Sequence, residues 1–554
     1  MPECGECLSP KTFGQGVTWM FRRLLPTLVA VSALLASVAG GGIASAQGNY
    51  NQSNTVISAQ DISDAVTLDP GVAYEFSSVA ADLQMYTTLV RFPPGNLNHV
   101  SPSLATSWTD SNAGRDWVFH LRKGVKFSNG DPVTAQDVVY SLERVVNIPN
   151  DPASWLITQT GLTPQNFAKS IQAVGNYEVK MTLPQPFAPG AWLAILANTV
   201  AGVVDQKVVE QHVVNGDWGT HWLYNHSAGS GPYVLQNWTP SQQMAFTANP
   251  NYSLGPKPQV QRLVWQMEAD TTARLDMLLR GDADLAIGLT SAQIKSLQGN
   301  PNIKILKAPE IAEVYLGMGV KQVPALGNPL VREAVKYAID YNSIIKDLLQ
   351  GNGIELQGII PKGIFGYVNK LPYTYNLAKA KQLMAKAGYA KGFSATMLVP
   401  NSTFDGGVSG PELGLAVAGD LARIGIKISI RQLQSSELYS EYRAHKAQFI
   451  LAEWSLDYPD PQDFAAPFAD YTQKSLIWRL QDDNVQLAKL VEKSATMDDT
   501  PQRQALYNQI NADLVTGPFA VLFQPDEVIA YSKKLHNLTY DSANNIPWVN
   551  VVKH

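Results

Sequence analysis

The sequence predicts an α/β protein in which helices cover mixed β-sheets. Segments whose apolar residues recur at helical spacing alternate along the chain with short segments rich in β-branched and aromatic residues. At 554 residues the chain exceeds what one hydrophobic core supports, so we expect about three or four packing units. No repeat of fixed length and no low-complexity linker separates such units, which predicts that they interleave in sequence.

The composition is typical of a soluble globular protein and argues against a nucleic-acid partner. Hydrophobic residues make up 45% of the chain and charged residues 16%. The net charge of −5 leaves no basic surface that could neutralise many phosphates. We therefore expect no nucleic-acid partner.

The first 46 residues have the features of an export signal. Two basic residues, Arg22 and Arg23, precede an apolar run over 24–39, and Ala44-Ser45-Ala46 fits a signal peptidase site. The alternative is an uncleaved membrane anchor, but the run is short for a span and is diluted by proline, serine and glycine. No later apolar run is long enough to cross a bilayer, which favours an exported protein with a cleavable signal.

Both cysteines of the chain precede the apolar run of this signal. Cys4 and Cys7 have the C-x-x-C spacing of a redox or metal pair, but a segment removed on export cannot serve the mature protein, and Met20 is an alternative start. The mature chain then has no disulfide and no cysteine for lipidation. We expect a freely diffusing periplasmic protein, not a lipoprotein.

The first part of the mature chain contains a strand, a turn and a helix before its most informative stretch. A short strand is expected over 55–58, a turn at 69–71, and a helical stretch from there to Tyr86. Residues 104–146 then read as a strand, a turn and a second helix.

Within 104–146, alternation and capping define each element. The strand carries Trp117, Phe119 and Leu121 on its buried face, and Asn129-Gly130 follows as a turn. Thr134 is the expected N-cap of the helix, with an acidic residue in the first turn. The predicted buried stripe consists of Val138, Val139, Leu142, Val145 and Val146, and the predicted solvent face of Gln136, Asp137, Glu143 and Arg144.

The remaining chain alternates helices and strands in the same way. Gly281 and Gly388 are placed to end helices, and Asn328-Pro329 to begin one, with Val331, Val335, Ala338 and Ile339 as its buried stripe. Helical patterns cover 271–279, 378–387, 411–423 and 487–515, and strand patterns cover 177–183, 283–287, 426–430, 449–451 and 519–523.

The chain shows no catalytic or metal-binding motif. His221 and His226 are the closest histidine pair, yet their spacing places them on different sides of a helix without a third ligand nearby. Ser230 lies between glycines but not in a nucleophile elbow, so a tight turn over 227–234 is the better interpretation. We expect no enzyme activity, no metal and no cofactor.

An acidic and aromatic segment after the strand at 449–451 is the best candidate site. Trp454, Asp457 and Tyr458 follow a strand that runs into an irregular loop, a setting suited to holding a cationic organic group. Asp460 and Asp463 continue the acidic run, but prolines keep it out of a regular helix and the spacing is not that of a calcium loop. The residues alone favour a core tryptophan beside an aspartate that caps the loop.

Several motifs together resemble the family 5 extracellular solute-binding proteins, the dipeptide- and oligopeptide-binding components of ABC importers. The most specific is the stretch 105–144, from Ala-Thr-Ser-Trp to Tyr-Ser-Leu-Glu-Arg. Further landmarks follow in family order and cover the mature chain: Gly229 to Tyr233, Asn249 to Tyr252, Val331 to Ala334, Tyr337 to Asp340 and Ala378 to Gly388.

The resemblance implies a two-lobed, type II-like periplasmic-binding-protein clamp with an additional domain packed on its first lobe. The lobes would close on a ligand and present it to a membrane permease, and the protein would be a monomer. The implied division is a signal peptide at 1–46, a discontinuous lobe I at 47–80, 227–318 and 524–554, the additional domain at 81–226, and lobe II at 319–523.

The resemblance also implies which residues bind the ligand. In peptide-binding members, an aspartate in a W-x-x-D pattern pairs with the ligand's α-amino group, and Trp454 and Asp457 match that pattern. By rougher similarity Phe76 and Ser77 match the place where lobe I touches the ligand backbone, and Tyr458 is added for its adjacency.

One departure from the family bears on the ligand. Dipeptide binders that fix a free carboxylate place an arginine at the start of the helix matching 411–423, where this chain has Pro411 and Glu412. The implied ligands are longer peptides or an amine-bearing solute. The alternatives are a non-peptide solute such as a sugar, an opine or a nickel complex on the same fold, and, less in keeping with the sequence, a secreted hydrolase.

Overall fold

The computed structural model describes residues 54–149 and 153–554. The predicted export signal, with Cys4, Cys7 and the alternative start at Met20, lies outside the described residues. In the part that is described, helices and strands alternate from end to end, which confirms the α/β prediction. No helix of this part combines the length and the apolar character needed to cross a bilayer.

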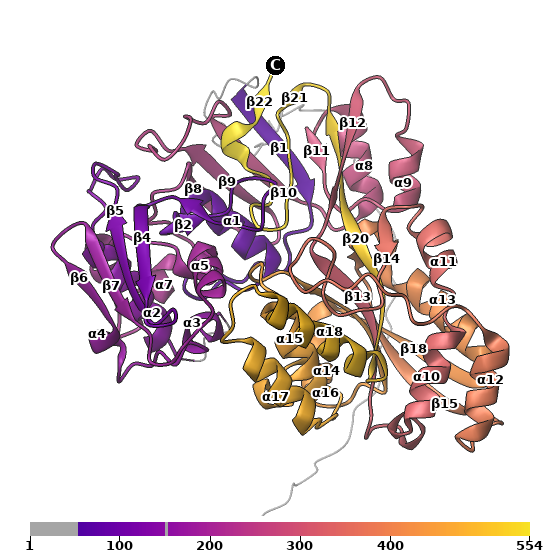
Figure 1. Ribbon diagram of the computed structural model, residues 1–554. Coiled ribbons are helices and arrows are strands. Elements are labelled where there is room, and N and C mark those ends of the chain that lie inside the picture. The colour runs from indigo at the N-terminus through magenta and orange to yellow at the C-terminus, as the bar shows by residue number, and fades with distance from the viewer. Residues whose placement is uncertain (1–53, 150–152) are drawn as a thin grey trace, which may run out of the picture. The chain divides into compact units, whose positions relative to one another are not determined.

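A mixed sheet of twelve strands forms the centre of the described residues (Figure 1). Its main path runs β18-β15-β19-β13-β20-β11-β1-β10-β9-β8, with β12 and β14 paired to β20 beside that path. The strands are β1 (Thr55–Gln60), β8 (Tyr233–Thr239), β9 (Gln243–Ala248), β10 (Arg262–Met267), β11 (Leu285–Ala286), β12 (Ile303–Pro309), β13 (Ala312–Met318), β14 (Gly353–Glu355), β15 (Phe393–Pro400), β18 (Ile426–Leu433), β19 (Phe449–Ser455) and β20 (Phe519–Ser532).

Strand β20 belongs to both ends of this sheet. Its first residues, from Phe519 to Phe523, pair antiparallel with β13, whereas Asp526 to Ser532 pair with β12. Tyr531 and Ala530 also lie opposite β11. We call β1 and β8 to β12 the first half of the sheet, and β13, β15, β18 and β19 the second half. The predicted strand at 519–523 is therefore only the start of a longer strand that connects the two halves.

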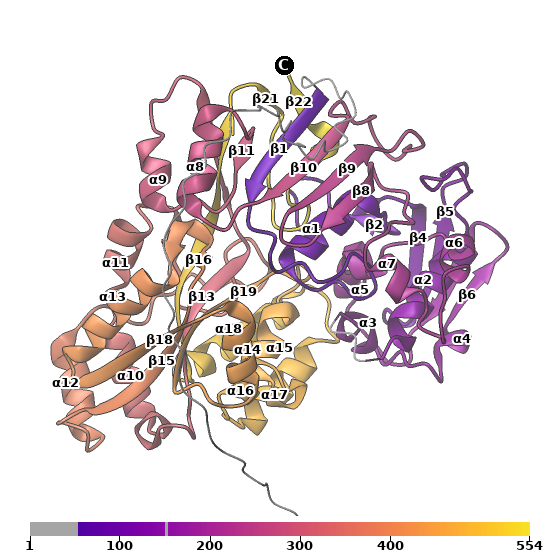
Figure 2. The same ribbon diagram turned by 180° about the vertical axis from the view of Figure 1, so that it is seen from behind.

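Strand β13 of the second half is buried on both faces, because every one of its residues is buried. Val314, Leu316 and Met318 face one helix layer, and Tyr315 faces the other. The first layer contains α10 (Pro329–Ala338), α12 (Leu377–Lys386) and α13 (Gly410–Ala422). The second contains α14 (Ser435–Arg443), α15 (Gln462–Ala469), α16 (Leu476–Arg479), α17 (Val485–Ser494) and α18 (Pro501–Val515), and Figure 2 gives the view of both layers from behind.

Local signals fix the ends of these helices as the sequence predicts. Asn328 caps α10 by accepting a hydrogen bond from the backbone N–H of Leu330, and the predicted stripe of this helix is fully buried. Gly388 has a φ of 85° just after α12, a conformation that glycine adopts without steric cost.

The first half is covered by α1 (Phe76–Met85) and by α8 (Thr271–Arg280) with α9 (Ser291–Ser296). Gly281 ends α8 at a φ of 80°, as predicted. Gly229 lies so close to α1 that an added Cβ would be 2.1 Å from the carbonyl oxygen of Met85. The Oγ of neighbouring Ser230 is 2.5 Å from Thr87 Oγ1, and this serine is 1% exposed, which agrees with a tight turn.

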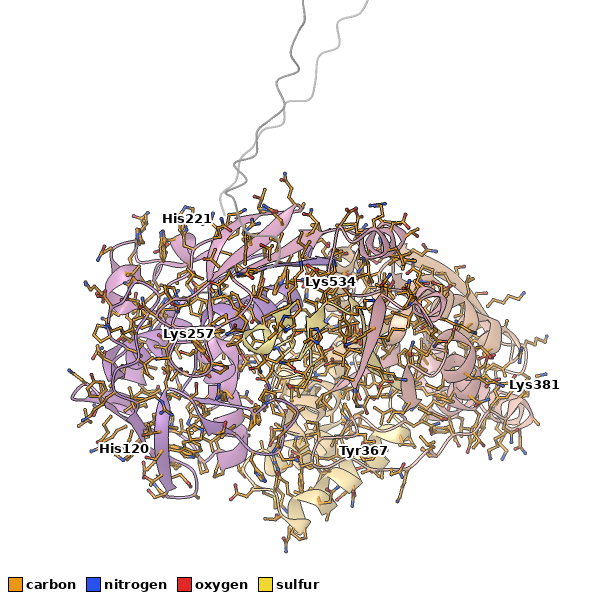
Figure 3. All side chains as sticks on the ribbon, turned by 90° about the horizontal axis from the view of Figure 1, so that it is seen from above. His120, His221, Lys257, Tyr367, Lys381 and Lys534 are labelled. Atoms are coloured by element: carbon orange, nitrogen blue, oxygen red, sulfur yellow. The ribbon has the colours of Figure 1, made fainter. Side chains whose placement is uncertain are left out.

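A separate four-stranded sheet, in the order β4-β5-β7-β6, carries the stretch that identifies the sequence. In the view from above, His120 of this sheet, on β5, and Lys381, on α12, lie at opposite ends of the described part of the chain (Figure 3). The strands are β4 (Ala105–Ser111), β5 (Asp116–Leu121), β6 (Ile171–Val174) and β7 (Glu178–Thr182), and the helices of this region are α2 (Ala135–Asn147), α3 (Trp155–Thr158), α4 (Phe167–Ser170), α5 (Pro189–Ala197), α6 (Gln206–Glu210) and α7 (Thr220–Leu223).

Helix α2 confirms the predicted cap and stripe but not the predicted solvent face. Thr134 and Asp137 form a reciprocal capping box. Arg144, predicted to face solvent, is 1% exposed and donates to both carboxylate oxygens of Asp69, at 3.1 and 2.5 Å. Asp137 is also buried. The prediction is wrong at both positions because each side chain has a partner distant in sequence: Arg144 pairs with Asp69, and Asp137 accepts the backbone N–H of Gln206.

Short elements complete the fold. They are the strand pairs β2 (Val90–Arg91) with β3 (Ser101–Pro102), β16 (Thr403–Phe404) with β17 (Val408–Ser409), and β21 (Leu535–His536) with β22 (Val552–Lys553), the one-turn helix α11 (Tyr341–Ser343), the π-helix η4 (Ile344–Leu348) and the 3₁₀ helices η2 (Thr199–Ala201), η3 (Pro324–Gly327), η5 (Asp405–Gly407), η6 (Tyr471–Gln473) and η7 (Trp548–Asn550).

Candidate functional site

The candidate site is centred on Asp457, two residues after the end of β19. The Oη of Tyr74, in the segment before α1, donates a hydrogen bond of 2.8 Å to Asp457 Oδ2. Asn198, just after α5, donates from Nδ2 to the backbone carbonyl of Asp457 at 2.6 Å. The aspartate therefore meets two segments that precede it by 383 and 259 positions.

A second aspartate, Asp463, holds the loop that contains Asp457 in place through hydrogen bonds. Asp463 is 0% exposed, and its Oδ2 accepts the backbone N–H of Asp457 at 2.8 Å. The indole Nε1 of Trp454 donates to the backbone carbonyl of Asp463 at 3.1 Å. These bonds fold residues 454–463 into a compact loop.

The surroundings of Asp457 hold its carboxyl group close to its titration point. Burial raises the pKa of Asp457 to about 7, and the hydrogen bond from Tyr74 acts in the opposite direction. Among the described residues no Lys, Arg or His forms an ion pair with this carboxylate. Such a group gains most from a ligand that brings a positive charge, because the cation replaces a proton held only weakly at neutral pH.

The third aspartate of the run is structural. Asp460 accepts two hydrogen bonds of 2.8 Å from the guanidinium group of Arg503, with side chains only 5% and 1% exposed. Asp463 lies in the first turn of α15, so the prediction that prolines keep the whole acidic run out of a regular helix is wrong at this position. The three carboxylates therefore have different partners. Asp457 lies at the candidate site, Asp460 pairs with Arg503, and Asp463 accepts a hydrogen bond from the loop backbone.

Among the predicted ligand residues, Trp454 contacts the loop through the backbone of Asp463. Tyr458 is 1% exposed, and its ring lies 6.3 Å from that of Trp155 in the core around the four-stranded sheet. Phe76 is 69% exposed at the first position of α1. The backbone N–H of Ser77 donates to Asp64 Oδ2 at 2.9 Å.

Two residues in contact with Asp457 were not predicted from the sequence. Tyr74 lies two positions before Phe76, and Asn198 directly follows a predictable helix, but neither belongs to a local motif. A pairing across hundreds of positions leaves no spacing signal in one sequence.

Within residues 54–149 and 153–554, no group of three or more His, Cys, Asp and Glu side chains is arranged to hold a metal ion. His226 instead stacks on Trp222, with ring centroids 4.7 Å apart, and its Nδ1 contacts the backbone carbonyl of Trp222 at 2.9 Å. The arrangement around Asp457 offers charge and hydrogen bonds for binding.

The family model of the bacterial extracellular solute-binding proteins, family 5, matches residues 99–475, which is more than half of the chain. The chain belongs to this family, which confirms the resemblance drawn from its motifs.

Relatives and solved structures cover most of the chain. The probable D,D-dipeptide-binding periplasmic protein DdpA of Escherichia coli K12 is 28% identical over 86% of this chain and 90% of its own length. The heme-binding protein A of Haemophilus influenzae is 26% identical, over 87% and 89%. The periplasmic binding protein DppA of Helicobacter pylori, solved with the peptide STSA, superposes with a TM-score of 0.79 at 25% identity, over 90% of this chain and 98% of that one. These similarities confirm the predicted fold class.

Proposed function

We propose that this protein captures peptides between two closing lobes and delivers them to the permease of an ABC importer. The observation that carries the proposal is the buried Asp457 carboxylate, whose side-chain partner is the neutral hydroxyl of Tyr74. The α-ammonium group of a peptide would be a positively charged partner for this carboxylate, which has none among the described side chains.

The relatives support a peptide ligand. The Helicobacter pylori structure contains a peptide, and the Escherichia coli relatives include dipeptide-binding and glutathione-binding proteins at 28% and 29% identity. In our proposal Asp457 anchors the amine, Trp454 supports the anchoring loop, and Phe76 and Ser77 present the start of α1 to the ligand. Tyr458 contributes by packing the loop against the additional domain.

The sheet supports a hinge between the proposed lobes. The chain passes between the two halves of the sheet where β12 leads into β13 and again within β20, around Pro525. We keep the division into lobe I at 47–80, 227–318 and 524–554, the additional domain at 81–226 and lobe II at 319–523. Closure about the two crossings would bring Tyr74 and Asn198 to Asp457.

We also propose that the mature protein is a periplasmic monomer released by cleavage of the signal at 1–46. Residues after 46 contain no cysteine, since both cysteines of the chain lie at 4 and 7, so the proposed mature protein has no thiol for lipid attachment.

Thermal unfolding in the presence of peptides tests the proposal. Mixed di- to tetrapeptides should raise the melting temperature of the parent protein, and N-acetylated versions should not, because acetylation removes the ammonium charge. In Asp457→Asn the rise should disappear. The matched control is Asp110→Asn on β4, an exposed residue of the four-stranded sheet, which should respond like the parent. A parent protein that responds equally to free and acetylated peptides contradicts the anchor.

A second candidate is an amine-bearing solute that is not a peptide. Glu412, where dipeptide binders of the family carry an arginine, accepts the hydroxyl of Ser409 at 2.7 Å in a capping box at the start of α13. This position therefore offers no cation for a ligand carboxylate. Mass spectrometry of the solute that co-purifies with the native protein decides between the two candidates.

A further inference from the structure

Four carboxyl groups gather where the two halves of the sheet meet. Glu310 lies between β12 and β13, Glu527 on β20, Glu453 on β19 and Asp405 at the start of η5. We call these four residues the hinge carboxylates. Electrostatic repulsion connects them: Asp405 raises the pKa of each of the three glutamates, and Glu310 raises that of Glu453 and Glu527.

The hinge carboxylates share few hydrogen-bond donors. Tyr540 donates from Oη to Glu310 Oε2 at 2.5 Å. Asp405 raises the pKa of Glu453, and Glu453 lowers that of Asp405, so the two side chains interact. Burial is the largest cause of the raised pKa values, which reach about 7 for Glu310 and about 6 for Asp405.

Glu527 is the most informative member because it is buried without a partner. It is 8% exposed, and its Oε1 is buried with no hydrogen-bond donor in reach. Glu453 Oε1 is also buried and unpartnered, although the residue as a whole is only half-buried. Leaving a buried acceptor unsatisfied costs about 1 to 3 kcal/mol, so such atoms point to a group that is absent from the chain itself.

Two other buried carboxylates of this chain are neutralised by arginine, whereas Asp82 and Glu313 resemble Glu527 in having buried oxygens without a hydrogen-bond partner among the described residues. Asp69 is paired with Arg144, and Asp460 with Arg503, each through two hydrogen bonds. In the described ranges none of the hinge carboxylates has an ion pair with Lys, Arg or His. Lys307, on β12, instead pairs with Asp526 at 3.0 Å. The hinge carboxylates therefore differ from the structural ion pairs of the same molecule.

We propose that the hinge carboxylates bind a second cationic group of the ligand, a lysine or arginine side chain of a peptide whose amino terminus is held by Asp457. This inference rests on the proposed function. Glu453 lies on β19 and Asp457 four positions later, beyond the end of the strand, and four fully extended residues span at most about 13 to 14 Å. At about 3.3 to 3.6 Å per extended residue, this spacing fits a basic side chain at the second or third position of the peptide.

Calorimetry with matched peptides tests the second cation site. The ligands are Ala-Lys-Ala and Ala-Ala-Lys, each compared with the same peptide carrying norleucine, which keeps the aliphatic chain and removes the charge. The parent protein should bind at least one lysine peptide about tenfold more tightly than its norleucine match. In Glu527→Gln, and independently in Glu453→Gln, this ratio should fall to within about threefold. Asp110→Asn should keep the parent ratio.

The outcomes separate this inference from the proposed function. If lysine and norleucine peptides bind the parent equally well, peptide binding stands and the second cation site is wrong, because the hinge carboxylates then hold protons only. If no peptide binds, the proposed function fails, and cadaverine and spermidine become the probes. Diamine binding that Glu527→Gln abolishes would keep the hinge carboxylates as a cation site, whereas absence of diamine binding would overturn it.

Discussion

The hydroxyl of Tyr74 donates a 2.8 Å hydrogen bond to the carboxylate of Asp457, across 383 positions of the chain. This bond stabilises the ionised form of a carboxyl group that burial otherwise keeps close to neutral. Tyr74 is therefore a positioning residue for the proposed anchor as well as a contact between distant segments.

Replacing Tyr74 by phenylalanine should weaken peptide binding without unfolding the protein. A hydrogen bond to a charged group contributes about 1.5 to 3 kcal/mol, so at neutral pH we expect a loss of affinity of about tenfold or more. The measurement is calorimetry on Tyr74→Phe, Asp457→Asn and the double variant. If Tyr74 acts through Asp457, it should matter far less once Asp457 is asparagine. Equal losses in both backgrounds would show an independent contact.

Peptide affinity should increase as the pH rises toward the pKa of Asp457. Because that pKa is about 7 without ligand, the carboxylate is mostly protonated at pH 6, and an ammonium ligand must displace the proton. From about pH 6 to about pH 7.5 we expect a gain of about sixfold, limited at higher pH by the α-amino group of the peptide itself. Tyr74 and Asp463 are the other titratable groups next to this carboxylate.

The pH profile of Asp457→Asn provides the control for that prediction. The variant should lose the gain along with most of the affinity, since asparagine does not titrate. A parent profile that is flat from pH 6 to 7.5 would mean that Asp457 is already ionised before the peptide binds.

The ion pair between Arg503 and Asp460 should contribute strongly to stability. Removing one partner leaves the other charge buried, which costs about 3 to 5 kcal/mol, so Arg503→Met should lower the free energy of unfolding by about that amount. The control is Arg431→Met, whose pair with Glu441 also spans 2.8 Å but has an arginine side chain that is 47% exposed. Its loss should cost at most about 1 kcal/mol. Urea unfolding of both variants measures the difference, and similar losses would contradict the structural role of Arg503.

Replacing glycine by alanine should affect the stability of the protein differently at two positions. In Gly229→Ala the new Cβ would lie 2.1 Å from the carbonyl oxygen of Met85, so α1 or the turn must shift and the melting temperature should fall. Gly190, in α5, has no atom within 4 Å of the added Cβ, and Gly190→Ala should be neutral or raise stability by a few tenths of a kcal/mol. Equal melting temperatures for the two variants would argue against the close approach of Gly229 to α1.

Local signals made much of the fold predictable from the sequence. The cap at Thr134, the stripe of α10 and the glycine end of α8 follow from interactions within a few residues, and all three are present. The solvent face of α2 could not be predicted, because the burial of Arg144 depends on Asp69, 75 positions away.

The candidate site also contains residues that a sequence pattern suggests and residues that no local pattern shows. Asp457 and Trp454 are found from a four-residue pattern and a family resemblance, and they stay a prediction until a ligand is bound. Tyr74, Asn198 and the hinge carboxylates are absent from any local pattern, because the folded chain brings them together from separate strands and loops. Sequence reasoning therefore suggested a candidate anchor but none of the residues that contact it.

The position of β20 has a consequence for the time at which the protein can fold. Residues 519–532 lie between β13 and β11 in the middle of the sheet, yet they follow the other eleven strands of this sheet in sequence. Neither half can complete its central hydrogen-bond ladder until all the other strands of the sheet have been synthesised. The central strand is therefore the last of the sheet to become available for folding.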